Sequence, residues 1–319
     1  MRVRTRAVAT GFVVLVLIAA IGLIVVLRQA GEGLRLPLAG RACTVQADGE
    51  VTLDSQQMAN AATIAAIGVQ REMPERAVVV ALATAYQESG LRNLAGGDRD
   101  SVGLFQQRPS QGWGTPTQIR DPRYAAGKFY AALKKVRGWE DMRVTDAAQK
   151  VQRSAFPEAY EKWADESQVL TRALLGNATT AVTCTVGGDP VMRGAAAIAA
   201  LAKGLTLDWG LTEFSPAEDS GPGSDYFATE VDREVGLASL TVGIRAAATR
   251  SADAPQTIPE GERAGWRYAH WLVSHAKEHG VKRVAFDGRE WTAKRGTWKR
   301  LPESERSSGQ VQAEVHADV

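Results

Sequence analysis

The sequence predicts an α+β protein: an N-terminal transmembrane helix, then a mainly α region and a smaller α/β region. Three observations lead to this prediction. An uncharged apolar run covers Gly11–Leu27, helical periodicity dominates residues 43–184, and helix and strand signals alternate over residues 185–301. The 319 residues suffice for about two domains, and a hydrophobic content of 45% excludes a disordered or fibrous protein.

Charge and cysteine content narrow the classes of function. Lys and Arg number 38 against 36 Asp and Glu, which is too balanced for a nucleic-acid binder that works by charge alone. Only 2 cysteines are present, so a zinc-finger or disulfide-rich scaffold is excluded. We expect no nucleic-acid partner and no cofactor.

The N-terminal run predicts a membrane anchor over residues 1–28. About 20 apolar residues span a bilayer as a helix, whereas a cleaved signal peptide has a shorter core of about 7–15. The flanking arginines are Arg2, Arg4 and Arg6 before the run and Arg28, Arg35 and Arg41 after it. The first cluster favours a cytoplasmic N-terminus, and the second weakens that argument. The prediction is a single-pass protein of the cell membrane with its body outside the cytoplasm.

A linker and a series of helices come next. Residues 29–42 are interrupted by Gly and Pro, which is typical of a tether. Helical spacing predicts helices over 54–69, from Pro74 to Glu88, and over 124–136, 145–154 and 157–175. Residues 96–116, rich in Gly, Asp, Ser and Pro, predict a long structured loop.

The C-terminal part carries weaker signals. Predicted elements are a helix over 191–202, a helix over 262–279 that stops at Gly280, and a strand over 281–286. Residues 236–244 fit a strand or a helix, and residues 215–225 and 251–261 fit loops. Residues 302–319 are polar and charged, which predicts a flexible tail.

The two cysteines bracket the helical region. Cys43 follows the linker and Cys184 lies at the expected domain boundary. This placement favours a disulfide formed in an oxidising compartment, in agreement with export. The alternative is two unrelated buried thiols.

Glu88 is the main candidate for catalysis. It continues an apolar helix stripe made of Val78, Ala81, Leu82 and Ala85. At the C-terminal end of a helix, both burial and the helix dipole favour the protonated form of a carboxyl group. A general acid needs that form. The alternative is a solvated glutamate at a helix end.

The residues around Glu88 carry a family pattern. They read Glu88-Ser89-Gly90-Leu91, then Ala95, Ser101 and Gly103-Leu104-Phe105-Gln106. This pattern resembles the lytic transglycosylases of the lysozyme superfamily: Gly103 follows Glu88 at the family's spacing, and Phe105 replaces the usual Met. The resemblance extends across residues 50–175, and the segment QQRPSQGWG looks like exported actinobacterial wall proteins.

The resemblance implies a mainly α, lysozyme-like domain over residues 43–184 and a mechanism. Glu88 would protonate the bond between N-acetylmuramic acid and N-acetylglucosamine in peptidoglycan glycan strands. It would then act as base while the muramoyl 6-hydroxyl closes a 1,6-anhydro ring. Ser101 and Gln106 would hold the sugar. Trp113, in the Gly-rich loop, is a candidate for stacking on a sugar, as is Trp139.

Two features leave alternatives open. The family's third motif has its nearest counterpart at 151–154, which lacks the tyrosine that orients the acid; the available tyrosines are Tyr86, Tyr124, Tyr130 and Tyr160. Asp98 and Asp100 could supply a second carboxylate for ordinary hydrolysis, which would make the protein a muramidase. The alternative for both is that they form turns.

The C-terminal region, residues 185–301, resembles a degenerate D-Ala-D-Ala carboxypeptidase-like domain of actinobacterial proteins. The resemblance rests on 265–272, His275 and 280–291, whereas residues 224–229 lack the family's zinc-binding His and Gly. We therefore expect a non-catalytic domain without a metal site. His275 and His279 have the i, i+4 spacing of metal ligands, but a solvated helix face fits them better.

These observations predict a membrane-anchored lytic transglycosylase that acts on peptidoglycan. A non-catalytic peptidoglycan-binding or envelope assembly protein is the alternative. A metal-handling protein that uses the two histidines is a third, weaker hypothesis.

Overall fold

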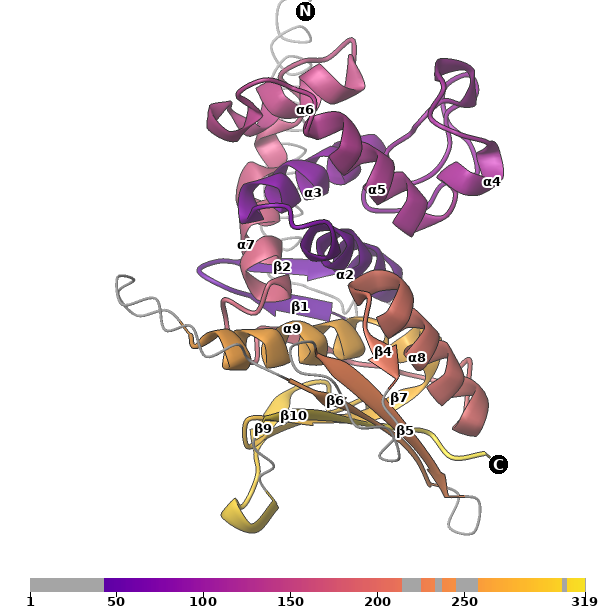
Figure 1. Cartoon of the computed structure of the whole chain (residues 1–319), viewed down its shortest axis with the longest axis vertical. Helices are drawn as coiled ribbons and strands as arrows, with labels where there is room; N and C mark the ends of the chain where they lie inside the picture. The colour runs from indigo at the N-terminus through magenta and orange to yellow at the C-terminus, as the bar shows by residue number, and fades with distance from the viewer. Residues whose placement is uncertain (1–42, 214–224, 233–236, 245–257, 306–308, 319) are drawn as a thin grey trace, which may run out of the picture. The chain divides into compact units, whose positions relative to one another are not determined.

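The structure is a computed structural model, and it describes residues 43–213, 225–232, 237–244, 258–305 and 309–318. The predicted anchor and linker lie outside these residues, as do most of the two loops predicted over 215–225 and 251–261. Within the described part, no helix is long and apolar enough to cross a membrane. Helices and strands are mixed along the chain, which confirms the α+β prediction (Figure 1).

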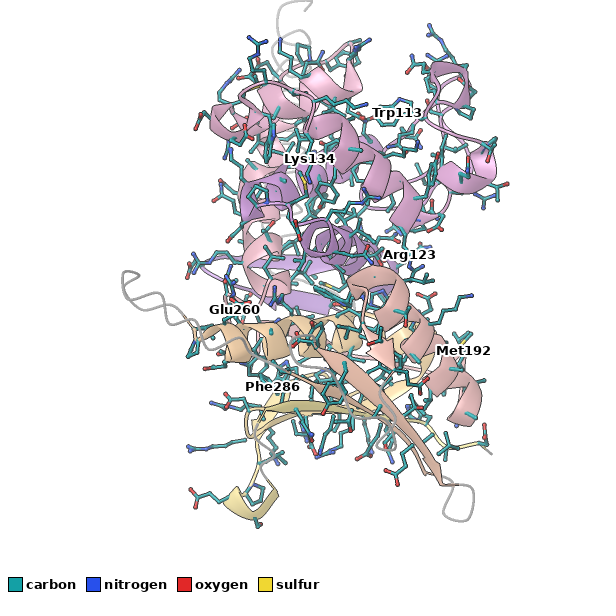
Figure 2. The ribbon with its side chains drawn as sticks, viewed as in Figure 1. Trp113, Arg123, Lys134, Met192, Glu260 and Phe286 are labelled. Atoms are coloured by element: carbon teal, nitrogen blue, oxygen red, sulfur yellow. A yellow bond between two sulfur atoms is a disulfide. The ribbon has the colours of Figure 1, made fainter. Side chains whose placement is uncertain are left out.

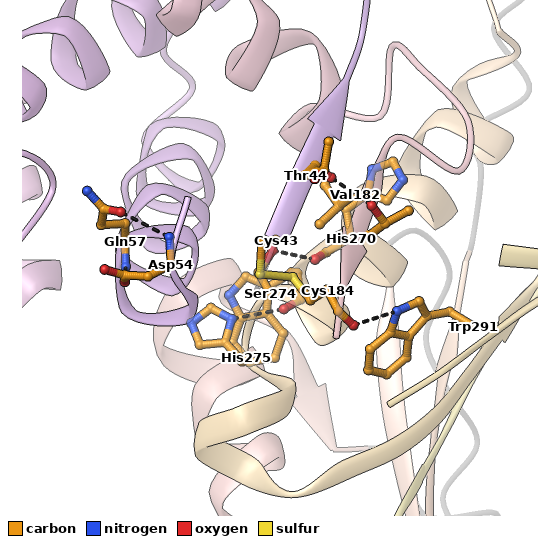
Figure 3. The surroundings of a disulfide bond; sticks show 12 residues. Cys43, Thr44, Asp54, Gln57, Val182, Cys184, His270, Ser274, His275 and Trp291 are labelled. Carbon is orange, nitrogen blue, oxygen red and sulfur yellow. Dashed lines mark hydrogen bonds between the residues drawn. A yellow bond between two sulfur atoms is a disulfide. The ribbon is translucent and has the colours of Figure 1, made fainter. Parts of the chain in front are cut away.

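A small antiparallel sheet joins the two ends of the helical region. Its strands, in the order β2-β1-β3, are β1 (Cys43–Gln46), β2 (Glu50–Leu53) and β3 (Val182–Cys184). Cys43 lies directly opposite Cys184 in the register of β1 and β3, and a disulfide joins them (Figure 3). The predicted pairing is confirmed. The indole Nε1 of Trp291 donates to the carbonyl of Cys184 at 3.2 Å, which attaches the second sheet to the first.

The helices between these strands largely follow the predicted ones. They are α2 (Ser55–Gln70), α3 (Glu75–Ser89), α4 (Pro116–Ile119), α5 (Pro122–Leu133), α6 (Val144–Gln152) and α7 (Ala164–Leu174), with one-turn 3-10 helices at Pro109–Gln111, Trp139–Asp141 and Glu161–Trp163. Asp54 begins α2 with a capping box shared with Gln57. Helix α3 packs against α2, α5, α6 and α7, so its C-terminal end is held from several sides.

The C-terminal region is a seven-stranded sheet with helices on one face. Its order is β4-β5-β6-β10-β7-β8-β9, and only β4 and β5 are parallel. The strands are β4 (Thr212–Glu213), β5 (Tyr226–Asp232), β6 (Leu237–Gly243), β7 (Val281–Phe286), β8 (Arg289–Thr292), β9 (Trp298–Arg300) and β10 (Gln310–Val315). Helices α8 (Gly194–Trp209), α9 (Glu260–Ser274) and α10 (Ala276–His279) complete the region, and α8 and α9 cover the face turned towards the helical region (Figure 1). Within the segment 236–244, which the sequence left open between strand and helix, Leu237–Gly243 form β6.

The prediction of a flexible tail over 302–319 is wrong. Its residues 310–315 form β10, which pairs with β6 on one side and β7 on the other, at the centre of the sheet. The physical reason is a period-2 pattern: Val311, Ala313 and Val315 are buried while the polar residues between them are half-buried. Three apolar positions suffice for a strand whose two neighbours are already paired.

The helical and C-terminal regions share one core. Residues 42–319 form a single compact unit, so the boundary predicted near Cys184 separates two sheets and not two compact bodies. Helix α9 contacts α2 and α7 on one side and β7 and β10 on the other. Its residues from Ala264 to Ser274 are buried, except half-buried Arg267, because a helix packed between two layers has no solvent face. His270 links the layers: Nδ1 donates to the carbonyl of Ala173 and Nε2 accepts from the amide of Ala181.

Candidate active site

The C-terminal end of α3 places Glu88 beside the loop that follows. Glu88 is half-buried in the last turn, and α3 stops at Gly90, which adopts the left-handed φ of 61°. The hydroxyl of Ser89 donates to the carbonyl of Leu104 at 2.7 Å, which joins the two halves of the family-like pattern. A Cβ on Gly103 would lie 2.6 Å from a backbone oxygen of α4, so only glycine fits there. The glycine at position 103 is therefore a packing requirement.

Two neutral side chains hold one oxygen of Glu88. The phenol of Tyr160 donates to Oε1 at 2.7 Å, and the amide Nε2 of Gln152 donates to the same atom at 3.1 Å. Gln152 also donates to the carbonyl of Phe105 at 2.8 Å. The site therefore joins the end of α3, the loop before α4 and the end of α6.

Tyr160 is the tyrosine that meets the acid, of the four that the sequence left open. Its ring is fully buried. Burial, and then the negative charge of Glu88, raise the pKa of Tyr160, so the phenol keeps its proton and remains a donor. Gln152 lies in the segment 151–154 that the sequence singled out, and Tyr160 comes from further along the chain.

The other three tyrosines have different partners. Tyr124 donates to the carbonyl of Trp113 at 3.1 Å, and Tyr130 donates to a carbonyl of α2 at 2.9 Å. Tyr86 stacks on Trp163 with ring centroids 4.8 Å apart. The sequence did not single out Trp163. Its indole Nε1 donates to Oε1 of Gln87, the residue before Glu88, at 3.0 Å. No local signal separates this tryptophan from the others in the chain.

The predicted sugar-binding residues occupy different surroundings. Ser101 is only 6% exposed, with its backbone amide bonded to the carbonyl of Asp98. Gln106 is half-buried, folds its amide back onto the carbonyl of Gly103 at 3.1 Å, and follows Phe105, whose carbonyl binds Gln152. Trp113 is half-buried against the core, and its carbonyl accepts a hydrogen bond from Tyr124 of α5 (Figure 2). Among these three, the backbone places Gln106 next to the group that holds Glu88.

The two aspartates of the loop differ. Asp100 accepts hydrogen bonds from Arg108 Nε at 2.8 Å and from the amide and hydroxyl of Ser110 at 2.7 and 3.0 Å. The Arg108 bond, followed by those of Ser110, holds the pKa of Asp100 well below its usual value. Asp98 is 90% exposed and lies 3.9 Å from the guanidinium of Arg99. The turn interpretation fits Asp100, because both of its oxygens are used within the loop.

His275, between α9 and α10, and His279, at the end of α10, do not share a solvated face, so that expectation is wrong for His275. His275 is only 3% exposed, its Nδ1 donates to the carbonyl of Trp271 at 2.9 Å, and its ring stacks on His279. Burial lowers the pKa of His275 to about 4, so it is neutral. Among the residues with described positions, no group of three or more metal-binding side chains could hold a metal ion.

Comparison with known proteins assigns the chain to no family. No protein-family model matches the chain, and no curated protein matches it.

Proposed function

We propose that the protein is a membrane-anchored lytic transglycosylase that cleaves the bond between N-acetylmuramic acid and N-acetylglucosamine in peptidoglycan. The single observation that carries the proposal is the bonding of Glu88: Tyr160 and Gln152 both donate to Oε1. Oε1 can accept these bonds whether the carboxyl group is protonated or ionised. Oε2 is thus the atom that gains and loses a proton, while the group keeps its position.

This geometry suits a reaction with one acid/base group. Oε2–H protonates the glycosidic oxygen as the bond to the muramoyl C1 breaks. The resulting carboxylate then takes the proton of the muramoyl 6-hydroxyl, whose oxygen attacks C1 and closes the 1,6-anhydro ring. Glu88 recovers in the second step the proton that it gave up in the first. The reaction therefore consumes no water and needs no second carboxylate. The bonding of Asp100 within its own loop supports this scheme over hydrolysis.

The proposed location rests on chain features outside the site. The apolar run at Gly11–Leu27 is proposed to anchor the chain in the cell membrane with its N-terminus in the cytoplasm. The Cys43–Cys184 disulfide supports an oxidising compartment for the body of the protein.

The test is digestion of purified sacculi by the protein and by its Glu88→Gln variant, with products read by mass spectrometry. We expect anhydromuramoyl ends from the wild type and at least about 100-fold less product from the variant, because the general acid is lost. Glu140→Gln, at an exposed glutamate on another element, is the matched control and is expected to keep full activity.

Other outcomes of this digestion would point to a different function. Reducing ends would identify a muramidase. Binding to sacculi without release of products, by a folded wild-type protein, would favour the peptidoglycan-binding protein.

A further inference from the structure

A cavity of about 480 Å³ lies between the helical and C-terminal regions. Side chains of α2, α5, α8 and α10 line it, together with Asn93 from the loop after α3. It is separate from the bonding group of Glu88, since none of the side chains bonded to Glu88 lines it. Its volume lies within the range of pockets that bind small molecules, about 300–1,000 Å³.

One wall of the cavity carries an arginine held in place by a buried acid. Arg123, at the start of α5, bonds through Nε to the carboxylate of Asp208 in α8 (Figure 2). Asp208 is fully buried and is itself fixed by Trp271 Nε1 at 2.8 Å and by the hydroxyl of Thr63 at 3.2 Å. The bond through Nε leaves the two terminal nitrogens of Arg123 as donors for a ligand, in the fork that matches a carboxylate.

The charges around the cavity balance. Arg123 and Lys203 are positive, while Asp208 behind the wall and Glu278 are negative, and His275 is neutral. A dianion such as phosphate would therefore gain no attraction from a net positive charge in the cavity. A molecule with one positive and one negative group finds a partner for each.

Two lining residues also carry unpaired buried atoms. Asn93 Oδ1 and His279 Nδ1 have no hydrogen-bond partner within the described part of the chain. Buried polar atoms are normally paired, so these two show that the chain does not satisfy all the polar groups around the wall of the cavity by itself.

We propose that this cavity binds a small zwitterion, an amino acid or a short peptide with free termini, whose carboxylate binds Arg123 and Lys203 and whose ammonium group binds Glu278. The proposal concerns a site apart from glycan cleavage and holds whether or not Glu88 is catalytic.

Calorimetric titration of the full chain with glycylglycine tests it. We expect saturable binding, and at least about tenfold weaker binding of acetylglycylglycine and of glycylglycinamide, each of which lacks one charge. Lys203→Glu is expected to weaken glycylglycine binding at least about tenfold, because it replaces an exposed partner of the carboxylate. Lys299→Glu on β9, which is also exposed, is the matched control and is expected to bind normally, as is Glu88→Gln.

Lys203 is the first choice for substitution because Arg123 belongs to the buried network and its loss would also affect folding. The proposal is overturned if glycylglycine does not bind, if Lys203→Glu binds it as the wild type does, or if phosphate and acetate bind as tightly as glycylglycine.

Discussion

Two carboxyl groups, Glu88 in the helical region and Asp208 in the C-terminal region, each accept several hydrogen bonds, and their partners differ. Glu88 is half-buried and receives two neutral donors on Oε1. Asp208 is fully buried and uses both oxygens, Oδ1 towards Arg123 and Oδ2 towards Trp271. Burial raises the pKa of Asp208 above its usual value, and the charge of Arg123 together with the hydrogen bonds opposes only part of that rise.

The difference separates a carboxyl group whose charge can change in place from one whose charge is needed to hold its partner in position. A carboxyl group with one open oxygen and neutral partners can change its charge without breaking a contact. A carboxylate paired with a cation and bonded at both oxygens stabilises the fold only as long as it stays ionised. Substitutions at the two positions should therefore affect different measurements.

The largest effect is expected from Asp208→Asn. The change leaves Arg123, whose side chain is 31% exposed, beside a buried neutral group, so the free energy of unfolding should fall by about 3 kcal/mol, the lower end of the range for a buried pair. Urea unfolding followed by circular dichroism measures it. Glu88→Gln is the partner variant, and its unfolding free energy should stay within about 1 kcal/mol of the wild type. Equal losses in both variants would remove the distinction drawn above.

Tyr160→Phe is expected to act on the reaction. The phenol supplies one of the two bonds to Glu88 Oε1, and a hydrogen bond to a charged group is worth about 1.5–3 kcal/mol, so cleavage of sacculi should slow by about 10–100-fold. Tyr130→Phe, at a buried tyrosine bonded to a carbonyl of α2, is the control and should keep the wild-type rate. A full rate in Tyr160→Phe would show that the acid needs no support from this side.

The smallest change, counted per histidine and per pH unit, is a pH dependence of stability that arises in the C-terminal region. Burial lowers the pKa of His270 and of His275 from 6.5 to about 4. Below pH 6.5 the unfolded state binds more protons, so stability falls as the pH drops towards 4, by up to about 1.4 kcal/mol per pH unit for each histidine. Unfolding free energies at pH 7, 6 and 5 check this. A flat profile over that range would mean that neither histidine is held neutral.

The sequence was informative where one element carries its own signal. Apolar spacing predicted α2 and α3, and Gly280 marked the end of the helix before β7. Short strands carry too weak a signal to be predicted. For example, β1 and β2 have four residues each, which is too few to show a period. The strand β10 was not predicted, because polar residues such as Gln312 and Glu314 alternate with its apolar ones and make the segment read as a polar tail.

The candidate site divides in the same way. The inward position of Glu88 follows from its own helix, so the sequence could predict it. Its partner Tyr160 is 72 positions away, and the contact depends on how α3, α6 and the turn before α7 pack together. Four tyrosines satisfied every local criterion, and only tertiary structure could select one.

Because β10 lies between β6 and β7, the centre of the large sheet can form only after residues 310–315 have been made. The strands β6 and β7 gain their shared neighbour only from residues 310–315, whereas Cys43 and Cys184 both emerge much earlier from a chain made from its N-terminus. The helical region can thus close its covalent loop while the large sheet still has a gap at its centre. During that interval β6 and β7 expose unpaired edges, and the pairing of β10 closes both edges at once and so removes a template for aggregation.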